Sequence, residues 1–212
     1  SRKTIWRTKI FPEYKIQRNK IYNDTNWKGG PVLGYCSDVI LPELQKKYGF
    51  KTIKIDGLEA DDIIACCVRK IQIKQPNRKI YIITNDHDYL QLKTQYVFLY
   101  NLKFKEVGGK KSTGDPQKDL FIKAVCGDKS DNIQSIFNKN TLVMRAFKKN
   151  LDNFYNEPTT FKEFCDVNNE TFYNNYLHNM KLISFDYIPK EYIDEFNKKY
   201  EYYLQSSKLL AN

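Results

Sequence analysis

The stretch Lys79-Ile-Tyr-Ile-Ile-Thr84, with Asn85-Asp86-His87-Asp88 directly after it, decides the fold class of this chain. The first part is a short, nearly continuous apolar run, as expected of a β-strand that is covered on both faces. The second part puts two carboxylates at the carboxyl end of that strand. Ligands of open α/β sheets bind at the carboxyl ends of the strands. The stretch therefore predicts a parallel sheet with an acidic site at its edge.

The segments before and after this strand extend the α/β pattern. We predict a strand at 52–55, a helix with helical apolar spacing at 60–73, and a further strand at 95–100. This order of strand, helix and strand is typical of parallel βαβ units. Pro12 is expected to end any early helix, and residues 21–40 have the Gly and Asn content of a flexible or irregular segment.

The second half of the chain is predicted to be mainly helical, which makes the fold class α/β with a central, mainly parallel sheet flanked by helices. Two Asn-rich patches, 150–156 and 168–179, have the composition of loops. The expected helices outside the sheet region are 42–48, 116–126, 131–137, 141–150, 160–165, 170–184 and 189–204.

Two further acidic clusters accompany the one after the strand. Carboxylates gathered this densely cannot stay ionised side by side without cations, and hard divalent ions such as Mg²⁺ or Mn²⁺ suit oxygen ligands. Each cluster alone also has a simpler structural explanation: helix capping, an Asx-type turn, or a solvated helix start. The seven carboxylates are Glu59, Asp61, Asp62, Asp86, Asp88, Asp128 and Asp131.

The rest of the chain is basic, and this contrast points to chemistry on a polyanion. The 212 residues carry a net charge of +10 and 15% aromatic residues, a combination that favours nucleic acid as partner. The five cysteines have no CxxC spacing and an odd count, which argues against zinc and a disulfide framework and fits a reducing compartment. No stretch approaches the length of a transmembrane helix, and no signal peptide opens the chain.

Five stretches, in order along the chain, resemble the 5′→3′ exonuclease and flap endonuclease family, which includes the 5′-nuclease domain of bacterial DNA polymerase I and phage flap endonucleases. The resemblance spans nearly the whole chain. One stretch, Trp6-Arg7 with Phe11-Pro12-Glu13-Tyr14-Lys15-Ile-Gln-Arg18, resembles the lead into the family's helical arch. The others are Gly57-Leu-Glu59-Ala-Asp61-Asp62-Ile-Ile-Ala65, Ile83-Thr-Asn-Asp86-His-Asp88-Tyr-Leu-Gln-Leu92, Gly127-Asp128-Lys-Ser-Asp131-Asn132-Ile133, and Asn179-Met-Lys-Leu-Ile183 ahead of Ile188-Pro189.

The resemblance implies a PIN-like 5′-nuclease fold. Residues 1–126 would form the α/β nuclease core, with the arch at 10–48. Residues 127–212 would form a helical region that packs on the core and holds a helix-turn-helix-like segment for duplex binding. The implied cofactors are two Mg²⁺ ions, with Mn²⁺ as a substitute.

The resemblance also assigns roles by position. Glu59, Asp61 and Asp62 would bind metal, Asp86 and Asp88 would serve both ions or the second, and Asp128 and Asp131 would complete the second site. Lys15 and Arg18 would reach the scissile phosphate as catalytic residues, with a solvated basic loop as the simpler alternative. The residues expected to bind DNA are Arg7, Lys15, Arg18, Lys20, Lys129 and Lys139.

Several neighbouring side chains have competing interpretations. We expect His87 to be a bystander, because alternation along an extended segment would point it away from Asp86 and Asp88. Mg²⁺ also prefers oxygen ligands. Three aromatic residues could stack on bases or simply pack in the protein, and the sequence leaves both alternatives open; they are Trp6, Tyr14 and Trp27.

The implied activity is Mg²⁺-dependent hydrolysis of DNA at 5′ ends and 5′ flaps, which removes RNA primers and flaps in replication and repair. We expect a monomer in an intracellular, DNA-containing compartment, whether an organelle, the nucleus or a viral replication site. The alternatives are a non-catalytic, structure-specific nucleic-acid-binding protein and a PIN-type ribonuclease. The arch motif Tyr14-Lys15-Ile-Gln-Arg18 favours the flap nuclease.

The chain departs from the family pattern in two places. The pattern expects a first strand with a metal-binding Asp, and another Asp seven residues before the equivalent of Arg7, so we expect the protein to extend upstream of Ser1. The family's Gly-rich turn, which holds K⁺ against duplex phosphates, corresponds here to 133–141, which contains no glycine. A tight phosphate-binding turn is harder to form without glycine, so K⁺ is a weaker expectation than the divalent ions.

Overall fold

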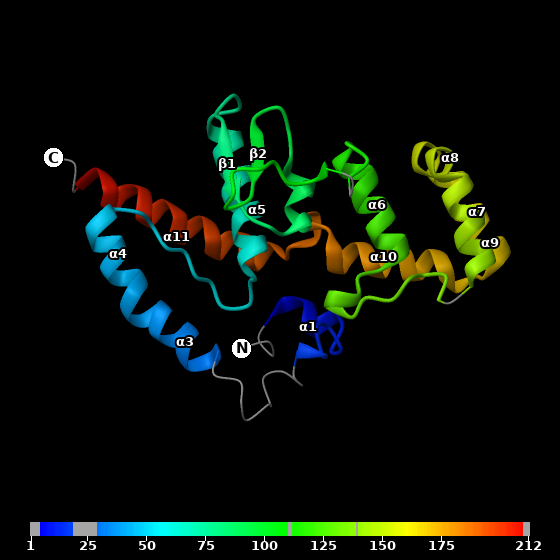
Figure 1. Cartoon of the computed structure of the whole chain (residues 1–212), viewed down its shortest axis with the longest axis horizontal. Helices are drawn as coiled ribbons and strands as arrows, with labels where there is room; N and C mark the ends of the chain where they lie inside the picture. Colours follow the sequence, from blue (N-terminus) through cyan, green and yellow to red (C-terminus); the bar gives the residue numbers. More distant parts are fainter. Residues whose placement is uncertain (1–4, 19–28, 110–111, 139, 210–212) are drawn as a thin grey trace. The chain divides into compact units, whose positions relative to one another are not determined.

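The computed structural model of the chain describes residues 5–18, 29–109, 112–138 and 140–209 (Figure 1). The chain divides into two compact units. The first combines Ser1–Ile63 with Pro189–Asn212, and the second is Ile64–Ile188. The domain boundary predicted near residue 126 stays a prediction.

The first unit begins with the short helix α1 (Trp6–Ile10). It ends at Phe11, ahead of Pro12, as predicted, because proline cannot continue a helix. The backbone N–H of Trp6 donates a hydrogen bond of 2.9 Å to the carbonyl of Gly57. This bond ties α1 to the segment that leads into the first acidic cluster.

The long helix α11 (Lys190–Leu209) belongs to the same unit and confirms the predicted helix at 189–204. Its Tyr192 ring lies so close to Gly57 that a Cβ there would come within 2.4 Å of a ring carbon. The φ of Gly57 is +90°, so glycine meets both the steric and the backbone requirement.

Among the described residues, every helix is too short or too polar to be a candidate membrane span.

A continuous helical run replaces the irregular segment expected at 21–40. It consists of α3 (Gly29–Tyr35), the π-helical turn η2 (Cys36–Ile40) and α4 (Leu41–Tyr48), and the last confirms the helix predicted at 42–48. The prediction of irregularity was wrong for 29–40 because Pro31 lies in the first turn, where a missing N–H is tolerated. Residues 21–28 lie outside the described ranges.

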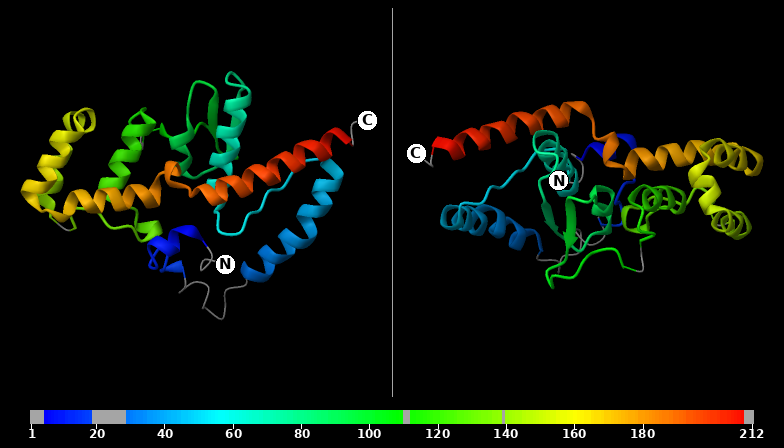
Figure 2. Two further views of the ribbon diagram at one scale, coloured as in Figure 1. Left: turned by 180° about the vertical axis from the view of Figure 1, so that it is seen from behind. Right: turned by 90° about the horizontal axis from the view of Figure 1, so that it is seen from above.

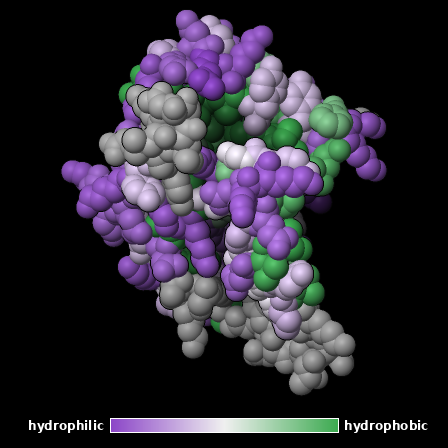
Figure 3. All heavy atoms as spheres, turned by 90° about the vertical axis from the view of Figure 1, so that its left-hand side faces the viewer, coloured by the Kyte–Doolittle hydropathy of each residue, from purple (hydrophilic) through white to green (hydrophobic). Residues whose placement is uncertain are grey.

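This run leaves many apolar side chains in solvent. Figure 3, seen from the side on which α4 lies in Figure 1, shows hydrophobic side chains exposed among hydrophilic ones. The exposed apolar side chains of the run are Val32, Leu33, Tyr35, Val39, Ile40, Leu41, Leu44 and Tyr48.

The strand predicted at 52–55 is absent: residues 51–55 form no regular secondary structure. Ile55 is nevertheless buried, which accounts for the apolar signal in this stretch. A strand needs a hydrogen-bonded partner, and none of the described residues pairs with this segment.

In the second unit, β1 (Ile80–Ile83) and β2 (Val97–Tyr100) pair in parallel, with Ile80 opposite Val97 (Figure 1). Both strands and their parallel pairing confirm the sequence prediction. The connection between them contains the short 3₁₀-helix η3 (His87–Leu92).

The prediction that β1 is covered on both faces was wrong. Tyr81 is 59% exposed and Ile83 is 52% exposed. The sheet of the described residues has two strands, so side chains on this face pack on one another instead of under a helix. The ring of Tyr81 stacks on that of Phe98 with centroids 5.2 Å apart.

Five of the predicted helices are confirmed, namely those at 60–73, 116–126, 141–150, 160–165 and 170–184. In the structure they are α5 (Ala60–Lys74), α6 (Pro116–Cys126), α7 (Thr141–Lys149), α9 (Pro158–Asn168) and α10 (Thr171–Ile183). The loops predicted at the two Asn-rich patches were wrong. Residues 151–156 form α8 (Leu151–Asn156), and most of 168–179 belongs to α10. Asparagine serves helix ends here: Asn140 caps α7, and the side chain of Asn169 accepts the N–H of Thr171 at the start of α10.

The helix predicted at 131–137 was also wrong. The stretch holds the end of a 3₁₀ turn, η5 (Lys129–Asp131), and then an irregular turn. Asn132 and Asn138 both adopt the left-handed conformation, with φ of 63° and 51°. Asparagine tolerates this conformation better than most residues, and a right-handed helix cannot contain it.

Aromatic side chains form the core of the helical part of the second unit. Helix α10 packs on α6 and α9, and Figure 2 shows it crossing α6 steeply, with α7, α8 and α9 grouped at its other end. The ring of Phe121 meets that of Phe161 edge to face at 4.9 Å. Much of the high aromatic content is therefore explained by packing. The buried cluster is Phe121, Val125, Ile136, Phe137, Val143, Phe147, Phe154, Phe161, Cys165 and Phe172.

We predict that Phe161→Ala lowers the free energy of unfolding by about 3–5 kcal/mol, because it leaves a cavity among five aromatic rings. Urea denaturation followed by circular dichroism measures this. Val167→Ala on the same helix is the control: Val167 is 86% exposed, and its change should stay within about 0.5 kcal/mol. Equal losses in both variants would contradict the assignment of the core.

Candidate active site: two carboxylate clusters, each with a lysine

The first cluster lies at the N-terminus of α5 and consists of Glu59, Asp61 and Asp62. Each can offer one carboxylate oxygen, and these oxygens lie within 4.8 Å of one another. The side chain of Asp62 accepts the backbone N–H of Glu59 at 3.1 Å, as the residue at position N3 of a capping box does. The positive end of the helix dipole favours acidic residues here. The simpler capping interpretation thus holds for Asp62.

Asp62 is fully buried and holds Arg7. Its two oxygens accept hydrogen bonds of 2.8 Å from Nη1 and Nη2 of Arg7, and Oδ2 also accepts Trp6 Nε1 at 3.0 Å. Burial alone would lower the pKa of Arg7, but the hydrogen bonds and charge of Asp62 outweigh it and raise that pKa. The structure places Arg7 inside its unit and not on the surface, so its predicted contact with DNA stays a prediction.

Glu59 is the partner of Lys15. The ammonium Nζ of Lys15 lies 2.6 Å from Glu59 Oε1, and the hydroxyl of Tyr14 donates to Oε2 at 2.9 Å. Lys15 is itself buried and has a φ of 54°, which is uncommon outside glycine. The predicted catalytic lysine is therefore an ion-pair partner of the first acidic cluster.

The aromatic residues of this region pack in the protein interior. Trp6 and Tyr14 are buried, and both donate hydrogen bonds to the carboxylates of the first cluster. Of the two alternatives left open for them, packing is the one that the structure supports. Trp27 lies outside the described residues.

Asp61 differs from its two neighbours. None of the described residues donates a hydrogen bond to it. Burial is the main cause that raises its pKa to about 6, and the charges of Glu59 and Asp62 add to the shift, while Arg7 and Lys15 oppose it. A divalent cation beside this carboxylate would favour its ionised form. The donor set of this cluster therefore fits a metal ion.

The second cluster consists of Asp88, Asp128 and Asp131, whose carboxylate oxygens also lie within 4.8 Å of one another. Two local caps shape it. Asp86 caps η3 by accepting the N–H of Asp88 at 2.9 Å, and Asp128 caps η5 by accepting the N–H of Ser130 at 2.7 Å. A two-way backbone bridge between Asp128 and Ile133, with both bonds 2.8 Å long, closes the loop. The Asx-type turn expected after β1 is thus present beside the carboxylates.

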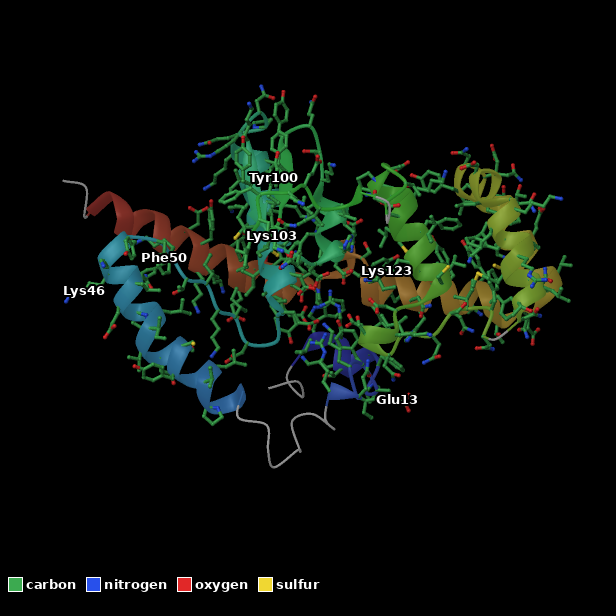
Figure 4. The ribbon with its side chains drawn as sticks, viewed as in Figure 1. Glu13, Lys46, Phe50, Tyr100, Lys103 and Lys123 are labelled. Atoms are coloured by element: carbon green, nitrogen blue, oxygen red, sulfur yellow. The ribbon has the colours of Figure 1, made fainter. Side chains whose placement is uncertain are left out.

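Lys123 on α6 is the residue that the sequence analysis missed (Figure 4). Its ammonium donates to Oδ1 of Asp88 and lies 2.8 Å from Oδ2 of Asp128. Burial would lower the pKa of Lys123, but the two carboxylates outweigh it and raise that pKa. Its place one helical turn before Gly127 could have indicated that it reaches the acidic loop.

The pKa values of the two carboxylates that hold Lys123 shift in opposite directions. Burial raises the pKa of Asp88 more than Lys123 lowers it, and the charges of Asp86 and Asp131 add to the rise. Asp128 is also partly buried, but hydrogen bonds from Lys123 and Ser130 outweigh that effect and lower its pKa. A bound cation would therefore favour the ionised form of Asp88.

A cavity of about 840 Å³ opens at the second cluster. Asp86 lines it but is exposed and lies outside the group of three close carboxylates. His87 lines it too, because it begins the 3₁₀-helix η3; the argument from strand alternation was wrong. Among the described residues, neither carboxylate cluster includes His87. The lining residues that belong to the second cluster or to the short segments beside it are Asp86, His87, Asp88, Lys123, Asp128 and Ser130.

Four other residues are predicted to bind DNA, and the structure describes two of them. Arg18 is partly buried, and its backbone N–H donates to the carbonyl of Lys15 at 3.0 Å. Lys129 is exposed at the start of η5. Lys20 and Lys139 lie outside the described residues. The DNA-binding roles of these four side chains stay predictions.

The turn after the second cluster forms without glycine. Asn132 supplies the left-handed conformation at the end of η5, and its backbone N–H donates to the carbonyl of Lys129. This turn precedes 133–141, so the expectation that a phosphate-binding turn is harder to form there without glycine stays a prediction. Its use as a K⁺ or phosphate site stays a prediction.

Comparison with known sequences gives one consistent result. Residues 1–118 match the family described as 5′-3′ exonuclease, N-terminal resolvase-like domain. A 5′-3′ exonuclease of Buchnera aphidicola subsp. Acyrthosiphon pisum is 32% identical over 164 residues, which are 74% of this chain and 53% of that protein. The ribonuclease H of Enterobacteria phage T4 is 30% identical over 196 residues, 87% of this chain and 61% of that protein. The chain thus spans between half and two thirds of the length of these relatives.

Solved structures share the fold. A phage T5 protein co-crystallised with metal ions matches with a TM-score of 0.68 and 20% identity, over 92% of this chain and 80% of that one. The flap endonuclease of phage T5, in a pseudo-enzyme–product complex with DNA and metal ions, matches with a TM-score of 0.64 and 22% identity, over 92% and 78%. The predicted 5′-nuclease fold class is confirmed.

We predict that Gly127→Ala disrupts the loop of the second cluster. The new Cβ would lie 2.5 Å from the carbonyl oxygen of Ile133, at a φ of +78°. Unfolding in urea should show a loss of about 2–4 kcal/mol. Gly114→Ala is the matched control, with a φ of +90° but nothing within 4 Å, and should cost about 1 kcal/mol. A larger loss in the control would overturn this account.

We also predict a pH effect from Asp61. Its pKa is about 6 in the folded protein and about 4 when unfolded, so the folded state binds more protons between these values. The metal-free protein therefore loses stability as pH rises from about 4 to 6. Asp61→Asn should make the metal-free protein more stable by about 1–3 kcal/mol at pH 7.5 and leave it nearly unchanged at pH 4.

Urea denaturation in EDTA at both pH values measures this difference. Asp56→Asn, at an exposed turn, is the control and should change little at either pH. Adding Mg²⁺ should recover the lost stability of the parent protein but not of Asp61→Asn. A variant that is no more stable than the parent at pH 7.5 would refute the argument.

Proposed function

The chain belongs to the 5′-3′ exonuclease family, and from this premise we propose that it is a structure-specific 5′ nuclease. The proposed reaction is hydrolysis of DNA phosphodiesters at 5′ ends and 5′ flaps, which leaves a 5′-phosphate and a 3′-hydroxyl. Removal of flaps and RNA primers during replication and repair is the corresponding cellular role. The observation that carries the proposal is the presence of two three-carboxylate clusters in a chain of this family.

Divalent ions, Mg²⁺ with Mn²⁺ as a substitute, are the proposed cofactors. Both clusters offer only carboxylate oxygens, which suit hard cations. Burial raises the pKa values of Asp61 and Asp88, and a bound cation would oppose that rise. The carboxylates of the two clusters would hold the ions, which would supply an activated water molecule and stabilise the leaving oxygen. The phage T5 structures, solved with metal ions and in one case with DNA, support dependence on metal ions.

Basic side chains of this chain would handle the substrate. Lys15 and Arg18 are proposed to bind the scissile phosphate, where a positioned ammonium and a guanidinium stabilise charge that develops in the transition state. For Lys15 this requires a move from Glu59 to the phosphate. The net charge of +10 favours DNA binding that weakens steeply with salt, because phosphate contacts release counterions. We propose that the protein acts as a monomer in a DNA-containing compartment.

Cleavage of a labelled 5′-flap DNA with Mg²⁺ tests the proposal on the full-length protein. Asp128→Ala should lower the rate at least about 100-fold, because it removes a ligand of one ion. Lys15→Met should lower it by a similar factor while leaving flap binding largely intact. Asp152→Ala, an exposed carboxylate that also pairs with a lysine of α6, is the control and should cut like the parent.

Three outcomes would count against the proposal. A parent protein that binds the flap with Mg²⁺ but never cuts it would be a non-catalytic nucleic-acid-binding protein. Normal cutting by Asp128→Ala would remove the metal assignment. Faster cutting of a single-stranded RNA than of the DNA flap would favour a PIN-type ribonuclease.

A further inference from the structure

The ammonium of Lys123 occupies the oxygens that a metal ion would need. Both oxygens of Asp128 are engaged: Oδ1 accepts the N–H and the hydroxyl of Ser130, and Oδ2 faces Lys123 at 2.8 Å. Lys123 also takes Oδ1 of Asp88. A divalent ion that coordinates both carboxylates has to share or displace these contacts.

The charge of Lys123 also opposes the binding of a metal ion at this cluster. Three carboxylates carry a charge of about −3 when ionised, and Lys123 brings one positive charge into their midst. It reduces the repulsion that would separate Asp88 from Asp128. It also repels any other cation that approaches the same oxygens. Lys123 therefore both assembles the cluster and opposes the ion for which the cluster is built.

We propose that Lys123 is a built-in competitor of the divalent ion at the second cluster, and that it raises the metal concentration at which this cluster fills. The inference rests on the proposed function, because it takes this cluster as a metal site. Lys123 is thus a residue that determines metal affinity, in addition to the ligands themselves. Its ammonium keeps the carboxylates together without metal and yields them when the ion binds.

The chain offers a close internal control in Lys118. It lies on the same helix, pairs with the carboxylate of Asp152, and its side chain is 21% exposed, against 26% for Lys123. Asp152 is not part of either carboxylate cluster. Removing Lys118 therefore deletes a comparable ion pair of α6 without changing the charge at the metal site.

The test is calorimetric titration of the full chain with Mn²⁺, without DNA. All proteins carry Asp61→Asn, so that the first cluster contributes less heat. Lys123→Met should lower the Kd for Mn²⁺ roughly tenfold, the size expected when one charge a few ångströms from a divalent ion is removed. Lys123→Arg keeps the charge and Lys118→Met leaves the site alone, so both should bind Mn²⁺ like the parent.

A second measurement guards against misfolding. Without metal, Lys123→Met should have a lower melting temperature than the parent, because its carboxylates repel one another. Saturating Mn²⁺ should raise that temperature more in Lys123→Met than in the parent. If Lys123→Met does not fold, Lys123→Gln replaces it in both measurements.

The outcomes separate the inference from the proposed function. If Asp128→Asn does not reduce Mn²⁺ binding by the parent, the metal assignment of the proposed function fails. If that binding depends on Asp128 but Lys123→Met binds Mn²⁺ equally or more weakly, the competitor role is overturned and the nuclease proposal stands. Tighter binding by Lys118→Met as well would show a general charge effect and would also overturn it.

Discussion

Like charges that are held together must be neutralised, and both acidic clusters of this chain are built around that constraint. In the first, Arg7 pairs with Asp62, and Lys15 pairs with Glu59. In the second, Lys123 lies between Asp88 and Asp128. Burial raises the pKa values of Asp61 and Asp88, so a further positive charge would favour their ionised forms. The remaining negative charge is what suits the clusters to divalent cations.

The backbone serves this constraint at positions where only certain residues fit. Gly57, packed under Tyr192, lets the chain turn just before Glu59. Gly127 brings Asp128 against Ile133 at a distance that no Cβ would allow.

Some of the basic residues that suggest a DNA-binding protein are buried in the interior and do not belong to its surface. Arg7 and Lys15 are buried, so net charge alone overstates what is available to a polyanion.

Local patterns predicted most of the secondary structure, and the errors have physical causes. Helix α6 was predicted with its observed bounds because Asp115 and Pro116 start it and Gly127 ends it. The stretch 52–55 is apolar because Ile55 is buried, although no strand forms there. Asparagines were taken for loop residues, but several of them cap helices or adopt left-handed turns. A composition signal cannot separate these uses, because all of them exploit the same short polar side chain.

By itself, the sequence determined the family of the chain, and its seven carboxylates predicted sites for divalent cations. It also determined which segments bring them, because each acidic group follows a strand or adjoins a helix end. Only the tertiary structure decided how each carboxylate is used. It paired the buried Asp62 with Arg7, placed Asp61 where burial raises its pKa, and brought Lys123 to the second cluster. Pairing across the fold depends on contacts between distant residues, and these leave no periodic trace in the sequence.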